Sequence, residues 1–206
     1  MRNDVDMKIE IRNFRESDLE SIYQICLLTG YSGKDASGLY KDPKLLGHYY
    51  AAPYALLEPE LTFVLNLDGQ PSGYILGAYD SEKFYEKCEE RWFPSFREKY
   101  KMPDITDKSP DAHIIRLIHK GNKPRPEMAN YPSHLHINLL PITQGRGLGR
   151  KMMDTFIAKL KEMNSPALHL EVGKKNKGAI AFYSKIGFHI IKEFEYSIAF
   201  GMKLKS

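Results

Sequence analysis

The sequence contains few cysteines and no pattern that would use them as a scaffold. Its 206 residues include two, Cys26 and Cys88, with neither a CxxC motif nor the spacing of a metal site. Such usage is typical of a reducing compartment, and an isolated cysteine is more often a buried thiol than a ligand. The sequence therefore predicts two buried thiols and no metal ion.

Long apolar runs and targeting segments are also missing. No stretch approaches the roughly eighteen apolar residues of a membrane-spanning helix. The N-terminus, MRNDVDMKIE, is charged and lacks the apolar core of a secretory signal. Neither internal repeats nor low-complexity tracts occur. These absences favour a cytoplasmic protein with no membrane partner.

The net charge is small but unevenly distributed. It is +4 at pH 7, which does not by itself indicate a nucleic-acid partner. The hydrophobic content of 42% and the length favour a single domain over residues 1–206. Between residues 144 and 185, nine Lys/Arg stand against three Asp/Glu, so the remainder is slightly acidic. This concentration of positive charge favours a small polyanionic ligand.

Hydrophobic periodicity predicts a mixed α/β fold. The expected strands are 7–12, a hairpin over 61–80, 133–140, 167–172 and 188–204, and the expected helices are 16–30, 45–50, 81–93, 147–163 and 176–186. The helix at 81–93 is expected to stop at Pro94, followed by an irregular, polar stretch to Pro132. Residues 30–60 and 81–130 are therefore interpreted as insertions. The long final strand could pair across a homodimer.

Residues 144–150, QGRGLGR, form a glycine-rich junction between a predicted strand and a predicted helix. A Walker loop would need Gly-Lys-Ser/Thr after Gly145, and that sequence is missing. A dinucleotide-binding fingerprint would place its third glycine one residue after Gly149, and too few residues follow for the rest of that fold, although Glu171 stands where a ribose-binding acid belongs. A ligand-free left-handed turn would need one glycine, not three. The pattern favours a phosphate held at the N-terminus of the helix.

Two blocks of sequence together resemble the GCN5-related N-acetyltransferase (GNAT) superfamily. The residues that carry the likeness are Gln144, Gly147 and Gly149 in the first block, and Asn176, Ala179, Phe182, Tyr183, Gly187 and Phe188 in the second. Within the superfamily, YPSHLHINLLP is similar to acetyltransferase-like domains attached to some O-GlcNAc hydrolases. The resemblance implies a central mixed, mostly antiparallel sheet, with splayed fourth and fifth strands, flanked by helices. The insertions then lie on the acceptor side.

The resemblance implies acetyl-CoA as co-substrate. The family's pantetheine arm pairs with the splayed fourth strand, and Pro141 suits a strand that stops pairing there. The residues expected to contact the cofactor are Leu139, Leu140, Pro141, Gln144, Gly145, Arg146, Gly147, Leu148, Gly149, Arg150, Asn176, Ala179, Phe182, Tyr183 and Lys185.

Acetyl transfer to an amine needs a proton donor for the thiolate and a base for the amine. Tyr183 matches the family's helix-borne tyrosine and is the expected acid, since a phenol stays protonated at neutral pH; packing is the alternative role. Glu171 resembles the base of the ribosomal-protein N-terminal acetyltransferases. Its alternative role is structural, as the partner of Lys174 or Lys175.

His134 and His136 alternate on the fourth predicted strand and are rival bases, with pKa values expected near the working range. A strand histidine is otherwise most often a satisfied core residue. Asn138 continues the same face and could hold a water.

The function predicted from these residues is acetyl-CoA-dependent N-acetyl transfer to a primary amine of a small molecule or peptide. The amine is expected to attack directly in a ternary complex. A non-catalytic acetyl-CoA-binding module and a transferase for a bulkier acyl group remain open. Both insertions are rich in aromatic residues, and the second carries Glu82, Glu86, Glu89 and Glu90. An aromatic and acidic cover of this kind over the acceptor side suits a cationic amine. The alternative is that the aromatic residues only pack the helices onto the rest of the protein.

Overall fold

The computed structural model describes residues 7–204, so most of the charged N-terminus discussed above lies outside the described residues. The strands are β1 (Ile9–Asn13), β2 (Thr62–Leu67), β3 (Gln70–Ala78), β4 (Ser133–Leu139), β5 (Ala167–Gly173), β6 (His189–Glu193) and β7 (Ser197–Lys203). The helices are α1 (Leu19–Thr29), α2 (Leu45–Tyr50), α3 (Ala52–Leu57), α4 (Ser81–Arg91), α5 (Phe93–Lys99), α6 (Pro110–Lys120), α7 (Leu148–Glu162) and α8 (Lys177–Lys185). Short 3-10 turns are η1 (Glu16–Asp18), η2 (Pro59–Leu61), η3 (Pro126–Met128) and η4 (Pro141–Thr143).

Within the described residues the strands form one seven-stranded sheet in the order β1-β2-β3-β4-β5-β7-β6. Every neighbouring pair is antiparallel except β4 and β5, which are parallel. That parallel pairing covers only Ser133 with Leu168 and His134 with His169. Beyond His134 the two strands separate, while β4 stays paired with β3 as far as Leu139. The predicted mixed, mostly antiparallel sheet is therefore confirmed.

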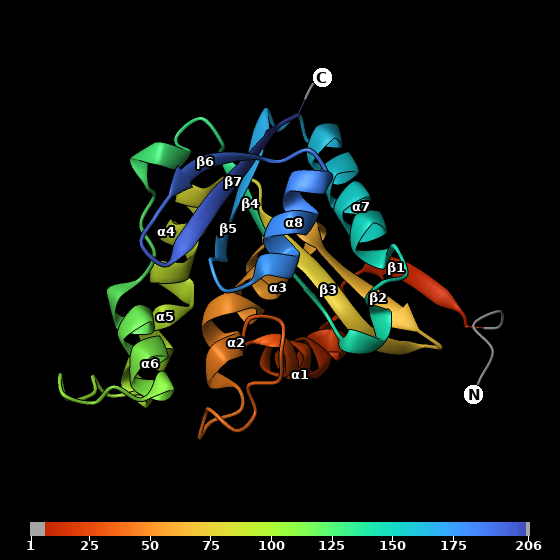
Figure 1. Cartoon of the computed structure of the whole chain (residues 1–206). Helices are drawn as coiled ribbons and strands as arrows, with labels where there is room; N and C mark the ends of the chain where they lie inside the picture. The colour runs from red at the N-terminus through yellow and green to blue at the C-terminus, as the bar shows by residue number, and fades with distance from the viewer. Residues whose placement is uncertain (1–6, 205–206) are drawn as a thin grey trace.

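Two hydrophobic cores lie on opposite faces of this sheet because successive strand residues point to opposite sides. Ile75 on β3 packs with Met152 and Phe156 of α7. Its neighbours Tyr74 and Leu76 pack with the helices of the two insertions. Figure 1 shows α7 and α8 on the viewer's side of the sheet and α4, α5 and α6 stacked at its left. Helices of the two insertions thus cover one face of the sheet, and α7 covers the other.

Local sequence signals account for the elements that were predicted. The β2–β3 hairpin turns at Asp68 and Gly69, which have φ of 51° and 80°. Two positive φ values are those of a type I′ turn, whose twist matches a hairpin. Helix α1 ends at the predicted Gly30.

The prediction of an irregular stretch after Pro94 is wrong. Helix α5 runs through Pro94, and α6 occupies residues 110–120. Each helix has its proline at a first-turn position, where no intrahelical N–H bond is lost. Ser109 caps α6 by accepting a bond from Ala112 N at 3.2 Å. Proline therefore stands in the first turn of these two helices, while the helix predicted over 81–93 ends at Arg91, just before Pro94.

The prediction of one long C-terminal strand over residues 188–204 is also wrong. The segment folds back as an antiparallel hairpin of β6 and β7, closed by a bond from Phe194 N to Ser197 O. Strand β7 lies between β5 and β6, so both of its edges are already paired. It is therefore unable to pair across a dimer in the way the sequence suggested.

Cys26 and Cys88 are buried, unpaired thiols, as predicted. In residues 7–204 no helix is long and apolar enough to cross a membrane. The same residues contain no cluster of histidine, cysteine and acidic side chains arranged to hold a metal ion.

Candidate active site

The glycine-rich loop forms a turn with bare backbone in front of α7. Gly145 and Gly147 have φ of 73° and 72°, the left-handed region that glycine enters without steric cost. Gly147 is the N-cap residue of α7 and has no side chain to cap the helix. The first turn of a helix leaves its N–H groups without intrahelical partners. These groups can therefore bind an anion.

Three segments that carry predicted cofactor residues meet at Gly149. A Cβ placed there would lie 3.3 Å from Leu139 Cδ1 at the end of β4 and 3.5 Å from Phe182 Cζ on α8. Gln144 joins the same assembly because its Nε2 donates to Leu139 O at 3.1 Å. Gln144 therefore ties the loop to β4, and its predicted contact with the cofactor stays a prediction.

Two arginines of the loop are exposed beside this turn. Arg150 pairs with Asp154 at 2.8 Å, and both side chains are more than half exposed. Exposed pairs of this kind contribute little stability, so the guanidinium can exchange partners at small cost. The Arg146 guanidinium contacts Met7 Sδ at 3.3 Å. The sequence prediction that both arginines contact the cofactor is compatible with these positions.

Helix α8 presents the second block of predicted residues. Asn176 caps the helix, with its Oδ1 accepting a bond from Ala179 N at 3.1 Å. Lys185 is exposed in the last turn. The Asn176 side chain thus has a local structural role, and contact with a cofactor would be additional to it.

Tyr183 lies on the inner side of α8 and is buried in the hydrophobic core that α7 also contacts. Its ring packs against Phe188 and Phe200, with ring centroids 5.8 and 5.9 Å apart. Burial raises the pKa of Tyr183, so the phenol is protonated at neutral pH. The side chain is therefore packed in the core, as the packing role expects. It also keeps the proton that the role as an acid requires.

Glu171 stands near the C-terminal end of β5 with two partners. Ser197 Oγ donates to its Oε1 at 2.5 Å, and Arg125 Nη1 lies 3.1 Å from its Oε2. The expected structural partner Lys174 instead pairs with Glu193 at 3.4 Å. The carboxylate is thus held in place from β7 and from the second insertion, while a third of it remains exposed.

His134 and His136 face the insertions and share one partner, the hydroxyl of Tyr54. The distances from Tyr54 OH are 2.9 Å to His134 Nε2 and 3.2 Å to His136 Nε2. Burial lowers the pKa of His136 to about 4 and that of His134 well below its ordinary value. The expectation of pKa values near the working range is therefore wrong. The cause is the cover of aromatic residues from α3 and α4.

Asn138, the next residue on this face, holds β4 against α1. Its Nδ2 donates to Thr29 Oγ1 at 2.5 Å, and Thr29 Oγ1 donates to Ile25 O. One N–H of the amide is therefore used, which leaves the second N–H and the carbonyl oxygen of Asn138 for the predicted water.

Several residues of the site were missed by sequence reasoning. Tyr54 lies 80 residues before His134, and Arg125 lies in a segment expected to be irregular. The His169 ring on β5 lies 5.5 Å from that of His134, and His169 Nδ1 donates to Tyr131 O, 2.7 Å away. An oxygen acceptor makes the ring nitrogen the donor. The only available signal was that His169 shares a strand face with Glu171.

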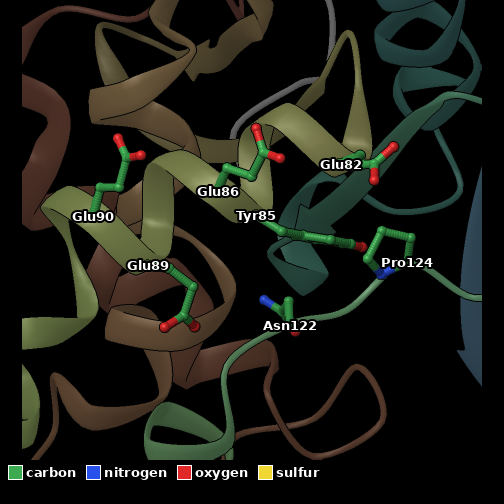
Figure 2. Close-up of a pocket in the computed structure, with 7 residues that line it drawn as sticks. All are labelled: Glu82, Tyr85, Glu86, Glu89, Glu90, Asn122 and Pro124. Carbon is green, nitrogen blue, oxygen red and sulfur yellow. The ribbon is translucent and has the colours of Figure 1, made fainter.

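A groove with a volume of about 290 Å³ runs beside this face. Figure 2 shows four glutamates on α4, with Tyr85 directed toward Pro124 and with Asn122 below it. These glutamates are Glu82, Glu86, Glu89 and Glu90. The Tyr85 ring also packs 5.4 Å from that of His134, so the acidic groove and the buried histidines share one wall.

Most aromatic residues of the insertions pack the helices together. Phe84 and Phe93 are fully buried, and Trp92 Nε1 donates to His48 O at 2.7 Å. Tyr31 is an exception, with 58% of its surface exposed. The packing interpretation is therefore favoured for this set as a whole.

Fold and loop together define a known class of protein, and comparison with known families confirms it. Residues 20–188 match the family model described as the Acetyltransferase (GNAT) family. The chain belongs to this family.

Individual relatives support the same assignment. Protein O-GlcNAcase of Rattus norvegicus is 30% identical over 186 residues, which cover 88% of this chain and 20% of that protein. The chain thus spans about a fifth of the length of the curated relatives it matches. The predicted resemblance to domains attached to O-GlcNAc hydrolases is confirmed.

Solved structures give the same fold. The crystal structure of SsHAT has a TM-score of 0.90 and 39% identity, and the match covers 97% of this chain and 100% of that one. The structure of yncA from Salmonella typhimurium, with its cofactor acetyl-CoA, has a TM-score of 0.56 and 15% identity over 96% of this chain and 94% of that one. At 15% identity the second likeness shows the fold alone.

Proposed function

We propose that the protein is an acetyl-CoA-dependent N-acetyltransferase that acts on a primary amine of a small molecule or peptide. The chain is proposed to form one acetyltransferase domain, with residues 30–60 and 81–130 inserted on the acceptor side. The observation that carries the proposal is the uncapped start of α7, with Gly145 and Gly147 in the left-handed region. This turn follows the end of β4, where β4 has separated from β5. The turn and the gap between the two strands are therefore proposed to form one continuous binding path for the cofactor.

Acetyl-CoA fits this arrangement in its chemistry. Its pyrophosphate suits the N–H groups of the first turn of α7 and the nearby Arg146 and Arg150. Its pantetheine amides suit the backbone of β4, which has no β5 neighbour beyond His134. Leu139 and Phe182 supply apolar walls at Gly149.

In the proposed reaction the amine nitrogen attacks the thioester carbonyl, so that a C–N bond forms and the C–S bond breaks. Tyr183 gives its proton to the departing thiolate. The proton lost by the amine goes to Glu171, or to a water held at His136. Because Ser197 and Arg125 fix the carboxylate, Glu171 is better placed as the base than histidines whose pKa values are lowered by burial.

The acidic groove supports a cationic amine as acceptor. Its four glutamates raise the local concentration of cations near the face that carries His136 and Glu171. Tyr85 forms part of both the groove and the cover of the histidines.

The test is release of free CoA thiol from acetyl-CoA, measured with and without added amines. A panel of a lysine-containing peptide, a peptide with a free N-terminus and short alkyl diamines spans the proposed acceptors. Release that depends on the amine, with the acetylated product seen by mass spectrometry, supports the proposal. Binding of acetyl-CoA without release for any amine would support a non-catalytic module instead. Larger acyl-CoA donors in the same assay test the size of the transferred group.

A further inference from the structure

A continuous chain of hydrogen bonds links the backbone before β4 to the ring of His136. Ser81 Oγ lies 2.6 Å from Pro132 O and 2.7 Å from His134 Nδ1. His134 Nε2 lies 2.9 Å from Tyr54 OH, which lies 3.2 Å from His136 Nε2. Ser81, His134 and Tyr54 are all buried. The protons of this series of hydrogen bonds therefore have few alternative positions.

The first half of the chain fixes the tautomer of His134. A backbone carbonyl only accepts, so the single hydroxyl proton of Ser81 must point to Pro132 O. Ser81 Oγ can then only accept from His134, which places a proton on Nδ1. A neutral imidazole carries one N–H, and burial keeps His134 neutral. Its Nε2 is therefore a lone pair, and Tyr54 must donate to it.

The second half of the chain fixes the tautomer of His136 in turn. The only proton of the Tyr54 hydroxyl is already directed to His134, so its oxygen accepts from His136. The proton of His136 is thus on Nε2, and Nδ1 carries the lone pair. In the part of the chain that the structure describes, no group is hydrogen-bonded to this Nδ1. As a residue His136 is half-buried, and it lies on the same face of β4 as Asn138.

We propose that His136 Nδ1 accepts an N–H of the acceptor amine, and that Tyr54 and Ser81 are positioning residues that hold it ready to do so. The inference rests on the acetyl transfer proposed above and names the group that orients its acceptor. A primary amine that donates one N–H to Nδ1 keeps its lone pair free to attack the thioester. The uncharged His136 ring does not repel a cationic amine. Because the pKa of His136 is only about 4, the ring does not take the proton from the amine. Glu171 remains the base.

The tautomer is tested directly by long-range proton–nitrogen NMR correlation on the whole chain. The wild type should show a bare, pyridine-like Nδ1 and a protonated Nε2 at His136. Tyr54→Phe keeps the ring that stacks on Phe84 and removes only the hydroxyl, so the two tautomers should mix. Tyr23→Phe is the matched control, because it removes another buried hydroxyl bonded to a histidine, 2.8 Å from His48 Nδ1. A protonated Nδ1 at His136 in the wild type would overturn the inference.

Kinetics then test the role in the reaction, with the amine from the panel that gives the fastest release. Tyr54→Phe should raise KM for the amine about two- to tenfold, the size of one neutral hydrogen bond, and leave kcat and the KM for acetyl-CoA within about twofold. His136→Asn, which keeps an acceptor oxygen, should retain more amine affinity than His136→Phe. An unchanged amine KM in Tyr54→Phe contradicts the inference. Failure of the wild type to bind acetyl-CoA would instead remove the proposed function, while the NMR result still decides the tautomer.

Discussion

Arg125 of the second insertion lies 3.1 Å from Glu171 near the end of β5, so an ion pair joins this insertion to the part of the sheet where β4 and β5 have separated. Ser197 on the neighbouring strand donates to the other carboxylate oxygen. An ionised carboxylate has about four lone-pair sites, so these two partners leave room for a water or an amine. The carboxylate is thus fixed in position and still able to accept a proton.

Glu171→Gln should lower kcat about a hundredfold, as expected for loss of a general base. Its free energy of unfolding should change by less than about 1 kcal/mol, because the pair is partly exposed and screened. The matched control is Glu193→Gln, which breaks the pair with Lys174 on the adjacent hairpin. Steady-state rates and urea denaturation of both variants provide the comparison. Equal rates for the two variants would leave Glu171 a structural residue only.

Tyr183→Phe should reduce kcat tenfold or more and leave affinity for acetyl-CoA nearly unchanged. The ring still fills the space against Phe188 and Phe200, so the fold should be retained. Turnover and calorimetric titration on the same preparation separate the two effects. Unaltered turnover would remove Tyr183 from the mechanism and leave it a packing residue.

The protein should lose stability as the pH falls from about 6.5 toward 4. The pKa values of His48 and His136 are lowered to about 4 by burial, and those of His134 and His169 are also lowered. A histidine whose folded pKa is depressed stays neutral in the folded state, while the unfolded state takes up its proton below pH 6.5. At pH 5 this costs about 2 kcal/mol each for His48 and His136.

Urea midpoints at pH 7.5, 6 and 5 measure this loss. His48→Asn removes one of the four groups and should make the decline shallower. A midpoint that is the same at pH 7.5 and pH 5 would show that these rings are protonated at little cost in the folded state.

Gly77→Ala should destabilise the protein by about 1–3 kcal/mol or more. A Cβ there would stand 2.1 Å from His134 O and 2.6 Å from Phe156 Cζ, where β3 passes between β4 and α7. The contrasting variant is Gly178→Ala, in the first turn of α8, where the nearest atom would be 4.0 Å away. It should stabilise the helix by up to about 1 kcal/mol. Thermal denaturation of both variants should therefore show shifts of opposite sign.

Much of the fold was readable from local patterns. The stripe Met152, Phe156 and Leu160 predicted α7, and the two β-rich runs on either side of residues 68–71 predicted the hairpin. Helix α6 was missed because its segment was interpreted as irregular, although Ser109 before Pro110 and Gly121 after α6 are start and stop signals of a helix. The C-terminal hairpin was missed because the bend after Phe194 carries neither glycine nor proline.

The chemistry of the site was less predictable than its location. The glycine loop and the paired histidines on β4 are visible in the sequence because each is a local pattern. The pKa of His136 depends on which residues cover it, and that cover includes Tyr54 from 82 residues earlier in the chain. The structural partner of Glu171 was likewise expected among its near neighbours, Lys174 or Lys175, although the folded chain supplies Arg125. Contacts of this range are set by the tertiary fold and leave no local signal.

The account depends most on the claim that the turn before α7 binds the phosphates of acetyl-CoA. Calorimetric titration of acetyl-CoA and of CoA into the wild type tests it, beside Gly147→Glu, which adds a carboxylate and backbone strain at φ 72°. Gly33→Glu is the matched control, because Gly33 has φ of 85° and the same open space around its Cα but lies in the first insertion. The account predicts micromolar binding that Gly147→Glu abolishes and Gly33→Glu preserves. Absence of binding by the wild type at low salt, or equal binding by Gly147→Glu, would contradict it.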